Sequence, residues 1–328
     1  MNRQIRLKSR PRGQPATAHF EAVDAPPPVV PEGGVLRRTL YLSLDPYMRG
    51  RMNDSKSYAA PVNVGDPMCG HTVSEVVESH NPAFRTGDIV AGYDGWQTYA
   101  ASSGKDLRKL DPGISPTTAL SVLGMPGLTA YVGLLDIGRP KAGETVVVSA
   151  ASGAVGSVVG QLAKINGCRA VGIAGSEEKC RYVVEELGFD ACVNHRTANL
   201  KAALGDACPN GIDIDFENAG GPVLEAVMRW LNRGARIPLC GLIAEYNAAE
   251  PPKGPNLRPL LVNRAMIQGF IVSDHMERAP AFLQEMTPHV LAGRIKYRED
   301  IVEGLDAAPE AFLGLLAGKN FGKLIVRL

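Results

Sequence analysis

The sequence predicts an α/β protein in which a parallel sheet, covered by helices, is inserted into a β-rich domain. Three observations carry this prediction. The N-terminal third is dense in glycine and proline, strand-length and helix-length segments alternate from Thr145 onward, and β-type runs return after about Gly293. Such changes of texture are typical of boundaries between structural classes. We therefore assign residues 1–125 and 294–328 to the β-rich domain and residues 126–293 to the alternating domain.

The β-rich domain is expected from short apolar runs separated by turn residues. Runs of this kind occupy 35–44, 71–79 and 88–93, and glycine and proline lie between them. The C-terminal tail has the pattern of a strand, a helix and a final strand, KLIVRL. Because a unit of this size is too small to fold alone, we expect the tail to join the N-terminal sheet.

The middle domain alternates between strand patterns and helix patterns. This alternation requires crossover connections, and it predicts a parallel sheet covered on both faces. Gly167 and Gly188 follow the first two helix patterns, where a left-handed C-terminal cap is expected. The segments are TVVVSA (145–150), AVGSVVGQLAKIN (154–166), RAVGIAG (169–175), EEKCRYVVEELG (177–188), IDIDFENAGG (212–221), VLEAVMRWLN (223–232), ARIPLCG (235–241) and MIQGFIV (266–272).

A glycine-rich turn joins the first of these strands to the first helix. Residues 151–156 fit the frame G-x-G-x-x-G with alanine in the first glycine position. Gly153 lets the backbone approach a pyrophosphate, Gly156 lets the helix pack closely on its strand, and the helix N-terminus attracts negative charge. Glycine at a tight turn is also useful without a ligand, but here the strand, loop, helix and second strand all agree. The pattern predicts a doubly wound Rossmann sheet that binds a dinucleotide.

The choice between NAD and NADP depends on the end of the second strand. An acidic residue there would bind the ribose hydroxyls of NAD, but this chain has Gly175 and Ser176. Lys179 follows within reach, whereas Glu177 and Glu178 fit exposed positions in the first turn of a helix. These residues favour the 2′-phosphate of NADP. The alternative is that Lys179 is only a solvated helix residue.

Composition narrows the classes of partner. The chain has 328 residues, 45% of them hydrophobic, and a formal net charge of +1, so it lacks the basic excess typical of nucleic-acid binding. No run approaches the length of a membrane span, and no apolar stretch follows the basic N-terminal residues as in a secretory signal. The six cysteines show no framework spacing and fit reduced thiols. We expect a cytoplasmic protein without nucleic-acid or membrane partners.

With these motifs the chain resembles the medium-chain dehydrogenase/reductase superfamily, in its zinc-free branch. That branch contains prostaglandin/leukotriene reductases, plant alkenal double-bond reductases and bacterial NADPH-dependent curcumin reductases, and the chain is most similar to the last group. The resemblance covers nearly the whole chain. It rests on LSLDPYMRGRM (42–52), GMPGLTAYVGLLDIG (124–138), AASGAVGSVVGQLAK (150–164), VGIAGSEEK (171–179), ELGFD (186–190), FENAGG (216–221), CGLIAEYN (240–247) and GKNFGKLIV (318–326).

The resemblance implies a GroES-like catalytic domain, an inserted Rossmann domain that binds NADPH, and a homodimer. It also implies that Lys179 holds the 2′-phosphate and that Thr129 lies near the nicotinamide end. His195 stands where relatives often place a tyrosine against the adenosine phosphate, and its charge at neutral pH is open. The pyrophosphate residues would be Gly153, Ala154, Val155 and Gly156, and the rest of the cofactor would be lined by Asn218, Cys240, Phe270 and Asn320.

The residues do not predict a metal site. Zinc-containing relatives use a cysteine and a G-H-E motif. In this chain Asp45 lies in the segment that supplies the cysteine, and Thr72 follows Gly70-His71 in place of the glutamate. Cys69 and His71 alone do not make a zinc site, and we expect a buried thiol and a hydrogen-bonded imidazole. Without a Lewis acid, alcohol dehydrogenation is disfavoured.

The expected reaction is NADPH-dependent reduction of the α,β double bond of enones or alkenals by hydride transfer to the β carbon. Phenol hydroxyls are suitable donors to the enolate oxygen that develops, and the candidates are Tyr246, Tyr58 and Tyr47. Each tyrosine could instead be a packing residue. Two rival functions stay open, a quinone reductase of the same superfamily and a non-catalytic NADPH-binding sensor.

Overall fold

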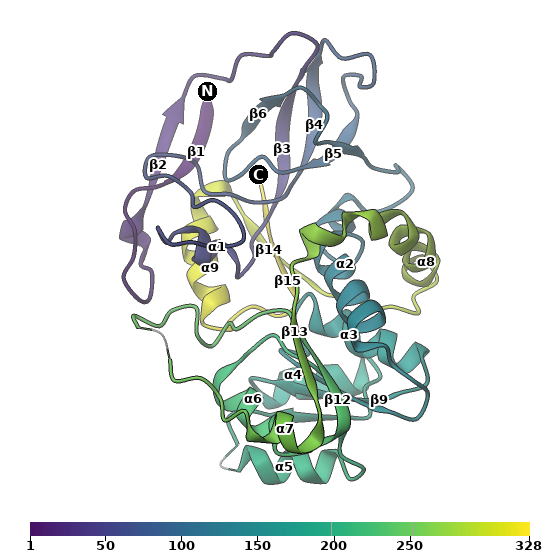
Figure 1. Cartoon of the computed structure of the whole chain (residues 1–328). Coiled ribbons are helices and arrows are strands. Elements are labelled where there is room, and N and C mark those ends of the chain that lie inside the picture. The colour runs from purple at the N-terminus through teal and green to yellow at the C-terminus, as the bar shows by residue number, and fades with distance from the viewer. Residues whose placement is uncertain (198, 251) are drawn as a thin grey trace. The chain divides into compact units, whose positions relative to one another are not determined.

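The computed structural model describes residues 1–197, 199–250 and 252–328, and it divides into two compact units. Residues Met1–Ser121 and Glu299–Leu328 form a β-rich unit, and Val122–Arg298 form the second unit. The chain therefore leaves the β-rich unit once and returns to it, as the colour gradient lets the reader follow (Figure 1). The predicted α/β class, with a parallel sheet and a separate β-rich part, is confirmed.

The β-rich unit is built on a sheet in the order β14-β15-β3-β4-β5-β7, with β6 also paired to β3. The C-terminal tail completes this sheet as expected, because β15 runs antiparallel to β3 with Ile325 opposite Ser43. A separate two-stranded sheet pairs β1 with β2. The bounds are β1 Asn2–Leu7, β2 Phe20–Ala25, β3 Val35–Ser43, α1 Met48–Arg51, β4 Thr72–Ser79, β5 Ile89–Gly92, β6 Tyr99–Ser102, β7 Arg108–Lys109, β14 Glu299–Glu303, α9 Ala308–Leu316 and β15 Lys323–Arg327.

Aromatic packing joins the N-terminal and C-terminal parts of this unit. Trp96 is fully buried and stacks on Phe20 of β2 with 5.7 Å between the ring centroids. Phe312 of α9 meets the Trp96 ring edge-on at 5.8 Å. Because aromatic side chains bury large apolar areas, these three rings fix the returning tail to the first strands.

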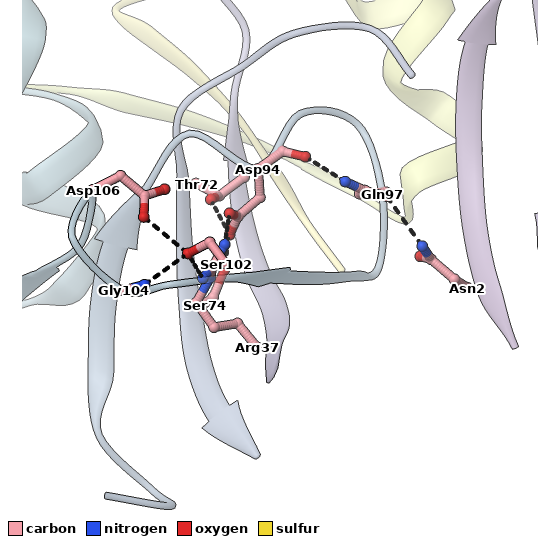
Figure 2. Close-up of polar contacts among 9 residues, drawn as sticks. All are labelled: Asn2, Arg37, Thr72, Ser74, Asp94, Gln97, Ser102, Gly104 and Asp106. Carbon is pink, nitrogen blue, oxygen red and sulfur yellow. Dashed lines mark hydrogen bonds and ion pairs between the residues drawn. The ribbon is translucent and has the colours of Figure 1, made fainter. Parts of the chain in front are cut away.

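A buried ion pair organises the polar interior of the same unit (Figure 2). Arg37 of β3 is bound to Asp94, and each side chain has only 2% of its area exposed. Asp94 also accepts hydrogen bonds from the hydroxyls of Thr72 at 2.8 Å and Ser74 at 3.0 Å. Ser102 in turn accepts a hydrogen bond from Arg37 at 2.7 Å. Since a buried charge is tolerated only when it is paired and hydrogen-bonded, this network satisfies the condition.

The second unit is a six-stranded, fully parallel sheet in the order β10-β9-β8-β11-β12-β13. Gly167 and Gly188 both have φ of +74°, so the two predicted left-handed caps are confirmed. The bounds are α2 Met125–Tyr131, β8 Thr145–Ser149, α3 Gly156–Ile165, β9 Arg169–Ala174, α4 Glu177–Glu185, β10 Ala191–Asn194, α5 Leu200–Ala207, β11 Ile212–Phe216, α6 Gly221–Met228, β12 Leu231–Leu239, α7 Arg258–Asn263, β13 Met266–Gly269 and α8 Ala279–Leu291.

Close packing against the segment between α4 and β10 explains Gly160 of α3. A Cβ added at Gly160 would lie 1.8 Å from the ring of Phe189, which is itself buried. All five residues of β8 are buried, as a central strand covered on both faces requires. Within the described parts of the chain, no helix is long and apolar enough to cross a membrane.

Candidate cofactor and active site

The loop between β8 and α3 has the shape of a phosphate cradle. Ala150 adopts φ of +52°, and its carbonyl accepts a hydrogen bond from the N–H of Gly153 at 2.9 Å. A Cβ added at Gly156 would lie 2.5 Å from the oxygen of Ala150, so only glycine lets the helix begin there. A left-handed alanine is an uncommon conformation that often marks a functional turn. The loop therefore fits a dinucleotide pyrophosphate.

The N-terminus of α3 adds a favourable charge to this loop. The helix has ten residues, and the side chain of its N-cap residue, Val155, makes no capping hydrogen bond. Its first turn, which begins Gly156-Ser157, contains no acidic residue. The partial positive charge of the helix end is therefore not neutralised by the protein, which suits an anion.

Residues after β9 gather positive charge where a 2′-phosphate is expected. Ser176 caps α4 by accepting the N–H of Lys179 at 3.2 Å, which fixes the start of that helix. The Nε2 atom of His195 lies 3.2 Å from the position that a Cβ at Gly175 would take. Desolvation, followed by the charges of Arg196 and Lys179, lowers the pKa of His195. The lowered pKa favours the neutral imidazole of His195, so the positive charge near Gly175 comes from Lys179 and Arg196.

The carboxyl ends of β8, β11 and β12 are tied together by Glu217. Its Oε1 accepts hydrogen bonds from the Ser149 hydroxyl at 2.5 Å and from the N–H groups of Ala219 at 2.6 Å and Gly220 at 3.1 Å. The amide of Asn218 donates to the carbonyl of Ser149 at 2.8 Å. This network holds Asn218 beside the end of β8, from which the phosphate loop leaves. Ligands of open parallel sheets bind at such carboxyl ends.

A second carboxyl group lies below Glu217, and sequence reasoning missed it. Asp215 and Glu217 are both 0% exposed, and neither oxygen of Asp215 has a hydrogen-bond partner among the described residues. Burial, followed by the charge of Glu217, raises the pKa of Asp215 well above its usual range. The two acids are close enough to hydrogen-bond once one of them is protonated. The sequence does contain a signal for this pair of acids. Apolar residues alternate at Ile212, Ile214 and Phe216, which places Asp215 and Glu217 together on the other face of a strand whose two faces are both covered.

Three further residues predicted to contact the cofactor, Cys240, Phe270 and Thr129, also lie in the parallel-sheet unit. Burial raises the pKa of the Cys240 thiol to about 12, so the thiol is neutral. Phe270 is buried and packs edge-on against Phe216 at 6.2 Å. The Thr129 hydroxyl donates to the carbonyl of Met125 in its own helix at 2.7 Å. Phe270 and Thr129 therefore also have packing and helix roles.

Tyr246 lies in the loop after β12. Its hydroxyl oxygen accepts the N–H of Leu242 at 3.3 Å and lies 3.1 Å from the position of a Cβ at Gly241. Gly241 is hydrogen-bonded through its N–H to the carbonyl of Glu217 at 3.1 Å. The phenol of Tyr246 is thus held next to the same strand ends as Asn218.

The β-rich unit contains the other predicted site residues. The Tyr47 hydroxyl donates to that of Tyr93 at 3.4 Å, and burial raises the pKa of Tyr47 well above its usual range. Tyr58 is 58% exposed, in a segment without regular structure. Asn320 donates to the carbonyl of Gly322 at 2.8 Å just before β15. Sequence reasoning missed Tyr93, the hydrogen-bond partner of Tyr47.

The residues at the zinc positions of relatives have other partners in this chain. Asp45 accepts a hydrogen bond from Ser43 and forms a buried ion pair with Lys323 at 2.8 Å. Thr72 donates to Asp94, as described above. His71 differs from the expected hydrogen-bonded imidazole, because its Nδ1 has no partner within the described chain. Its ring instead packs edge-on against Tyr93 at 4.8 Å, so ring packing replaces a polar contact.

Comparison with known proteins places this geometry in a family. Residues 3–110 match the family described as the N-terminal domain of oxidoreductase, and residues 154–287 match the zinc-binding dehydrogenase family. An NADPH-dependent curcumin reductase of Escherichia coli is 53% identical over 100% of this chain and 97% of its own. A 2-alkenal reductase (NADP⁺-dependent) of Nicotiana tabacum is 42% identical over 99% and 97%.

A solved structure extends the likeness to three dimensions. CurA of Vibrio vulnificus in complex with NADPH superposes with a TM-score of 0.95 at 52% identity, covering 99% of this chain and 98% of the other. Sequence and fold therefore agree over the full length of both units. The chain belongs to the medium-chain dehydrogenase/reductase family, in the branch of the curcumin and alkenal reductases.

Proposed function

We propose that this protein catalyses the NADPH-dependent reduction of the carbon-carbon double bond of enones and alkenals. The observation that carries the proposal is the pairing of the phosphate cradle at Gly153–Gly156 with Lys179 and Arg196, the two cations whose charges act on His195. The first fits a dinucleotide and the second fits the phosphate that distinguishes NADPH from NADH. Relatives that are 42–53% identical carry the names of a 2-alkenal reductase and a curcumin reductase.

We also propose which residues contact the cofactor. Backbone N–H groups of Gly153, Ala154 and Val155 at the start of α3 would hold the pyrophosphate, and Lys179 and His195 would hold the 2′-phosphate. Asn218, Cys240, Thr129 and Phe270 of the parallel-sheet unit would line the path toward the nicotinamide. Asn320 of the β-rich unit stays a predicted cofactor residue. When bound, NADPH supplies the hydride that the β carbon of the substrate accepts.

The protein's own chemical contribution is a donor for the substrate oxygen. Charge develops on that oxygen as an enolate forms, and a fixed phenol stabilises it without reorganising. Tyr246 is the first candidate because it is anchored to Leu242 beside Asn218. Tyr47 and Tyr58 are the candidates from the β-rich unit, and the raised pKa of Tyr47 keeps its phenol protonated. The α carbon also takes up a proton, for which we assign no dedicated acid.

Replacing Tyr246 by phenylalanine tests this assignment. We expect Tyr246→Phe to lower kcat for an enone by about 10²-fold, because one donor to the enolate is lost. The affinity for NADPH, measured by quenching of protein fluorescence, should stay within about twofold. Tyr41→Phe, on β3, is the matched control and should keep full turnover. Unchanged turnover in the Tyr246 variant would remove Tyr246 from the mechanism.

A substrate panel separates the proposed function from its rivals. We expect NADPH oxidation with a linear enone, an alkenal and a curcuminoid, and slower oxidation with a quinone. Preference for the quinone would favour a quinone reductase. Failure to oxidise NADPH with every acceptor, despite tight binding of NADPH, would favour a non-catalytic sensor.

The outer edge of the parallel sheet supports a homodimer. β13 is the edge strand, and its residues Met266 and Ile267 are 41% and 37% exposed, next to Leu261 at 80%. An exposed apolar edge strand favours pairing with a second copy of itself. Light scattering during gel filtration should give twice the chain mass of 34.9 kDa. The six free cysteines suit a reducing compartment such as the cytoplasm.

A further inference from the structure

A single asparagine links α4 to the carboxyl end of β10. Asn194 is the last residue of β10, and it lies opposite Ala174, the last residue of β9. Its amide Nδ2 donates a hydrogen bond to Oε1 of Glu177, the first residue of α4, at 2.8 Å. Its Oδ1 accepts the N–H of Arg196 at 3.0 Å. One side chain therefore fixes both an acid of the helix and the backbone of a cation after the strand.

The same two segments contain the cations that lie near Gly175. Lys179, proposed to hold the 2′-phosphate, follows Glu177 by two positions on α4. Arg196 follows Asn194 by two positions in the turn after β10, where the carbonyl of Asn194 accepts the N–H of Thr197 at 3.0 Å. The link at Asn194 therefore joins the two chain segments that carry positive charge.

Glu177 is an acid that would oppose NADPH if it turned toward the cofactor. It is exposed, and only Gly175 and Ser176 separate it from the end of β9. In NAD-binding Rossmann units an acid about 20 residues beyond the glycine loop binds the ribose hydroxyls, and Glu177 stands at about that spacing. A carboxylate at that place also repels a 2′-phosphate, because the two charges have the same sign. The position of the Glu177 side chain therefore bears on the choice between the two cofactors.

We propose that Asn194 is a positioning residue for cofactor choice, which holds the Glu177 carboxylate against β10 and away from the 2′-phosphate of NADPH. The inference rests on the proposed function, in which Lys179 binds that phosphate. An amide suits this role because its Nδ2 donates to Glu177 while its Oδ1 accepts from Arg196. An ionised aspartate has no donor for Glu177, and an alanine has neither group.

Loss of the Asn194 contact releases the carboxylate. The released group meets the 2′-phosphate of NADPH as a like charge, whereas it accepts hydrogen bonds from the ribose hydroxyls of NADH. Both changes reduce the preference for NADPH. Because Glu177 is exposed and its charge is screened, we expect the ratio of the NADH to the NADPH dissociation constant to fall about fivefold.

The first experiment measures both dissociation constants by fluorescence titration of the full-length protein. Asn194→Ala should lower the ratio about fivefold. Glu177→Gln removes the charge but keeps an acceptor for Asn194, and it should keep the wild-type ratio to within about twofold. The double variant should return to within about twofold of the wild-type ratio. An undiminished loss in the double variant would overturn the proposal, because Asn194 would then act without Glu177.

Glu178 provides the matched control on the same turn of α4. It is an exposed acid like Glu177, but the amide of Asn194 donates to Glu177. Glu178→Gln should therefore not restore the ratio in the Asn194→Ala background. Asn194→Ser is the second variant if the alanine variant does not fold, since serine keeps an acceptor for a turn but lacks the amide. A wild-type ratio in the folded Asn194 variant, or equal rescue by Glu178→Gln, would contradict the proposal.

Salt separates the electrostatic role from a merely structural one. At about 1 M salt the screening length falls to about 3 Å, so the difference between Asn194→Ala and the wild type should shrink below about twofold. A difference that persists at high salt would refute the electrostatic basis. Lys179→Ala tests the phosphate assignment separately. Equal losses for NADPH and NADH in that variant would refute the proposed 2′-phosphate site, whereas a selective loss there with an unchanged Asn194→Ala ratio would refute only the role of Asn194.

Discussion

The β-rich unit and the parallel-sheet unit bury ionisable groups in opposite ways. In the β-rich unit two fully buried pairs join opposite charges, Arg37 with Asp94 and Lys323 with Asp45. In the parallel-sheet unit two buried carboxyl groups, Asp215 and Glu217, lie together. The first arrangement pairs each buried charge with its opposite, whereas in the second arrangement burial and the charge of Glu217 raise the pKa of Asp215. The two arrangements also connect different parts of the chain, because the opposite-charge pairs join strands to neighbouring loops and Glu217 joins the loop after β11 to the end of β8.

The largest expected effect comes from breaking an opposite-charge pair. Arg37→Met leaves Asp94 buried without its countercharge and should lower the free energy of unfolding by about 3–5 kcal/mol. Urea denaturation followed by circular dichroism measures this change. Arg38→Met is the matched control, because Arg38 pairs with Glu75 at the surface with 51% of its side chain exposed. The control should lose less than about 1 kcal/mol. Equal losses would show that burial does not decide the value of these pairs.

We expect an effect of intermediate size on cofactor binding from Lys179, the residue of the parallel-sheet unit proposed to bind the 2′-phosphate of NADPH. Lys179→Ala should weaken NADPH binding by about 1.5–3 kcal/mol, since it removes a charged hydrogen-bond donor to the 2′-phosphate. NADH binding should change little. Arg181→Ala, an exposed residue two positions later on α4, is the control. Titration of both cofactors by fluorescence decides the matter, and equal losses for NADPH and NADH would refute the phosphate role.

The smallest effect tests the paired carboxyl groups. The pKa of Asp215 in the folded protein is raised above its ordinary 3.8. The contribution of Asp215 to the stability of the fold is therefore complete below pH 3.8 and is lost as the pH rises through the folded-state pKa. Asp215→Asn should therefore gain about 1–2 kcal/mol of unfolding free energy near pH 8 and less near pH 5. Thermal unfolding across this pH range measures the gain.

Asp213 provides the control for that prediction on the same strand. It accepts hydrogen bonds from the Thr145 N–H at 2.9 Å and from the Asn232 amide at 2.8 Å. Asp213→Asn removes a satisfied acceptor and should not stabilise the protein at any pH. A loss of stability in Asp215→Asn near pH 8 would show that the two acids are not a strained pair.

Sequence reasoning predicted the elements whose local pattern and burial agree. β8 is a fully buried strand with three consecutive valines, α3 begins at a glycine that packing requires, and β15 joins β3 as its apolar character indicated. The short strand β10 was not predicted, because only Val193 of its four residues is buried and no alternation marks it. Its pairing with β9 is a long-range property of the sheet.

The candidate site was predictable in part for the same reason. Gly153, Gly156 and Lys179 follow from a local motif, and the structure supplies a cradle and a capped helix at those residues. The Leu242 contact of Tyr246, the Tyr93 contact of Tyr47 and the burial of Asp215 depend on loop paths and on neighbouring strands. No short sequence pattern encodes such contacts.

The most direct test of the proposed reaction follows the hydride itself. NADPH with deuterium at the transferable position of its nicotinamide ring is incubated with the enzyme and a linear enone, and the product is analysed by NMR. We expect a saturated ketone with the deuterium on the former β carbon. An allylic alcohol with deuterium on the former carbonyl carbon, or a product without deuterium, would contradict the account.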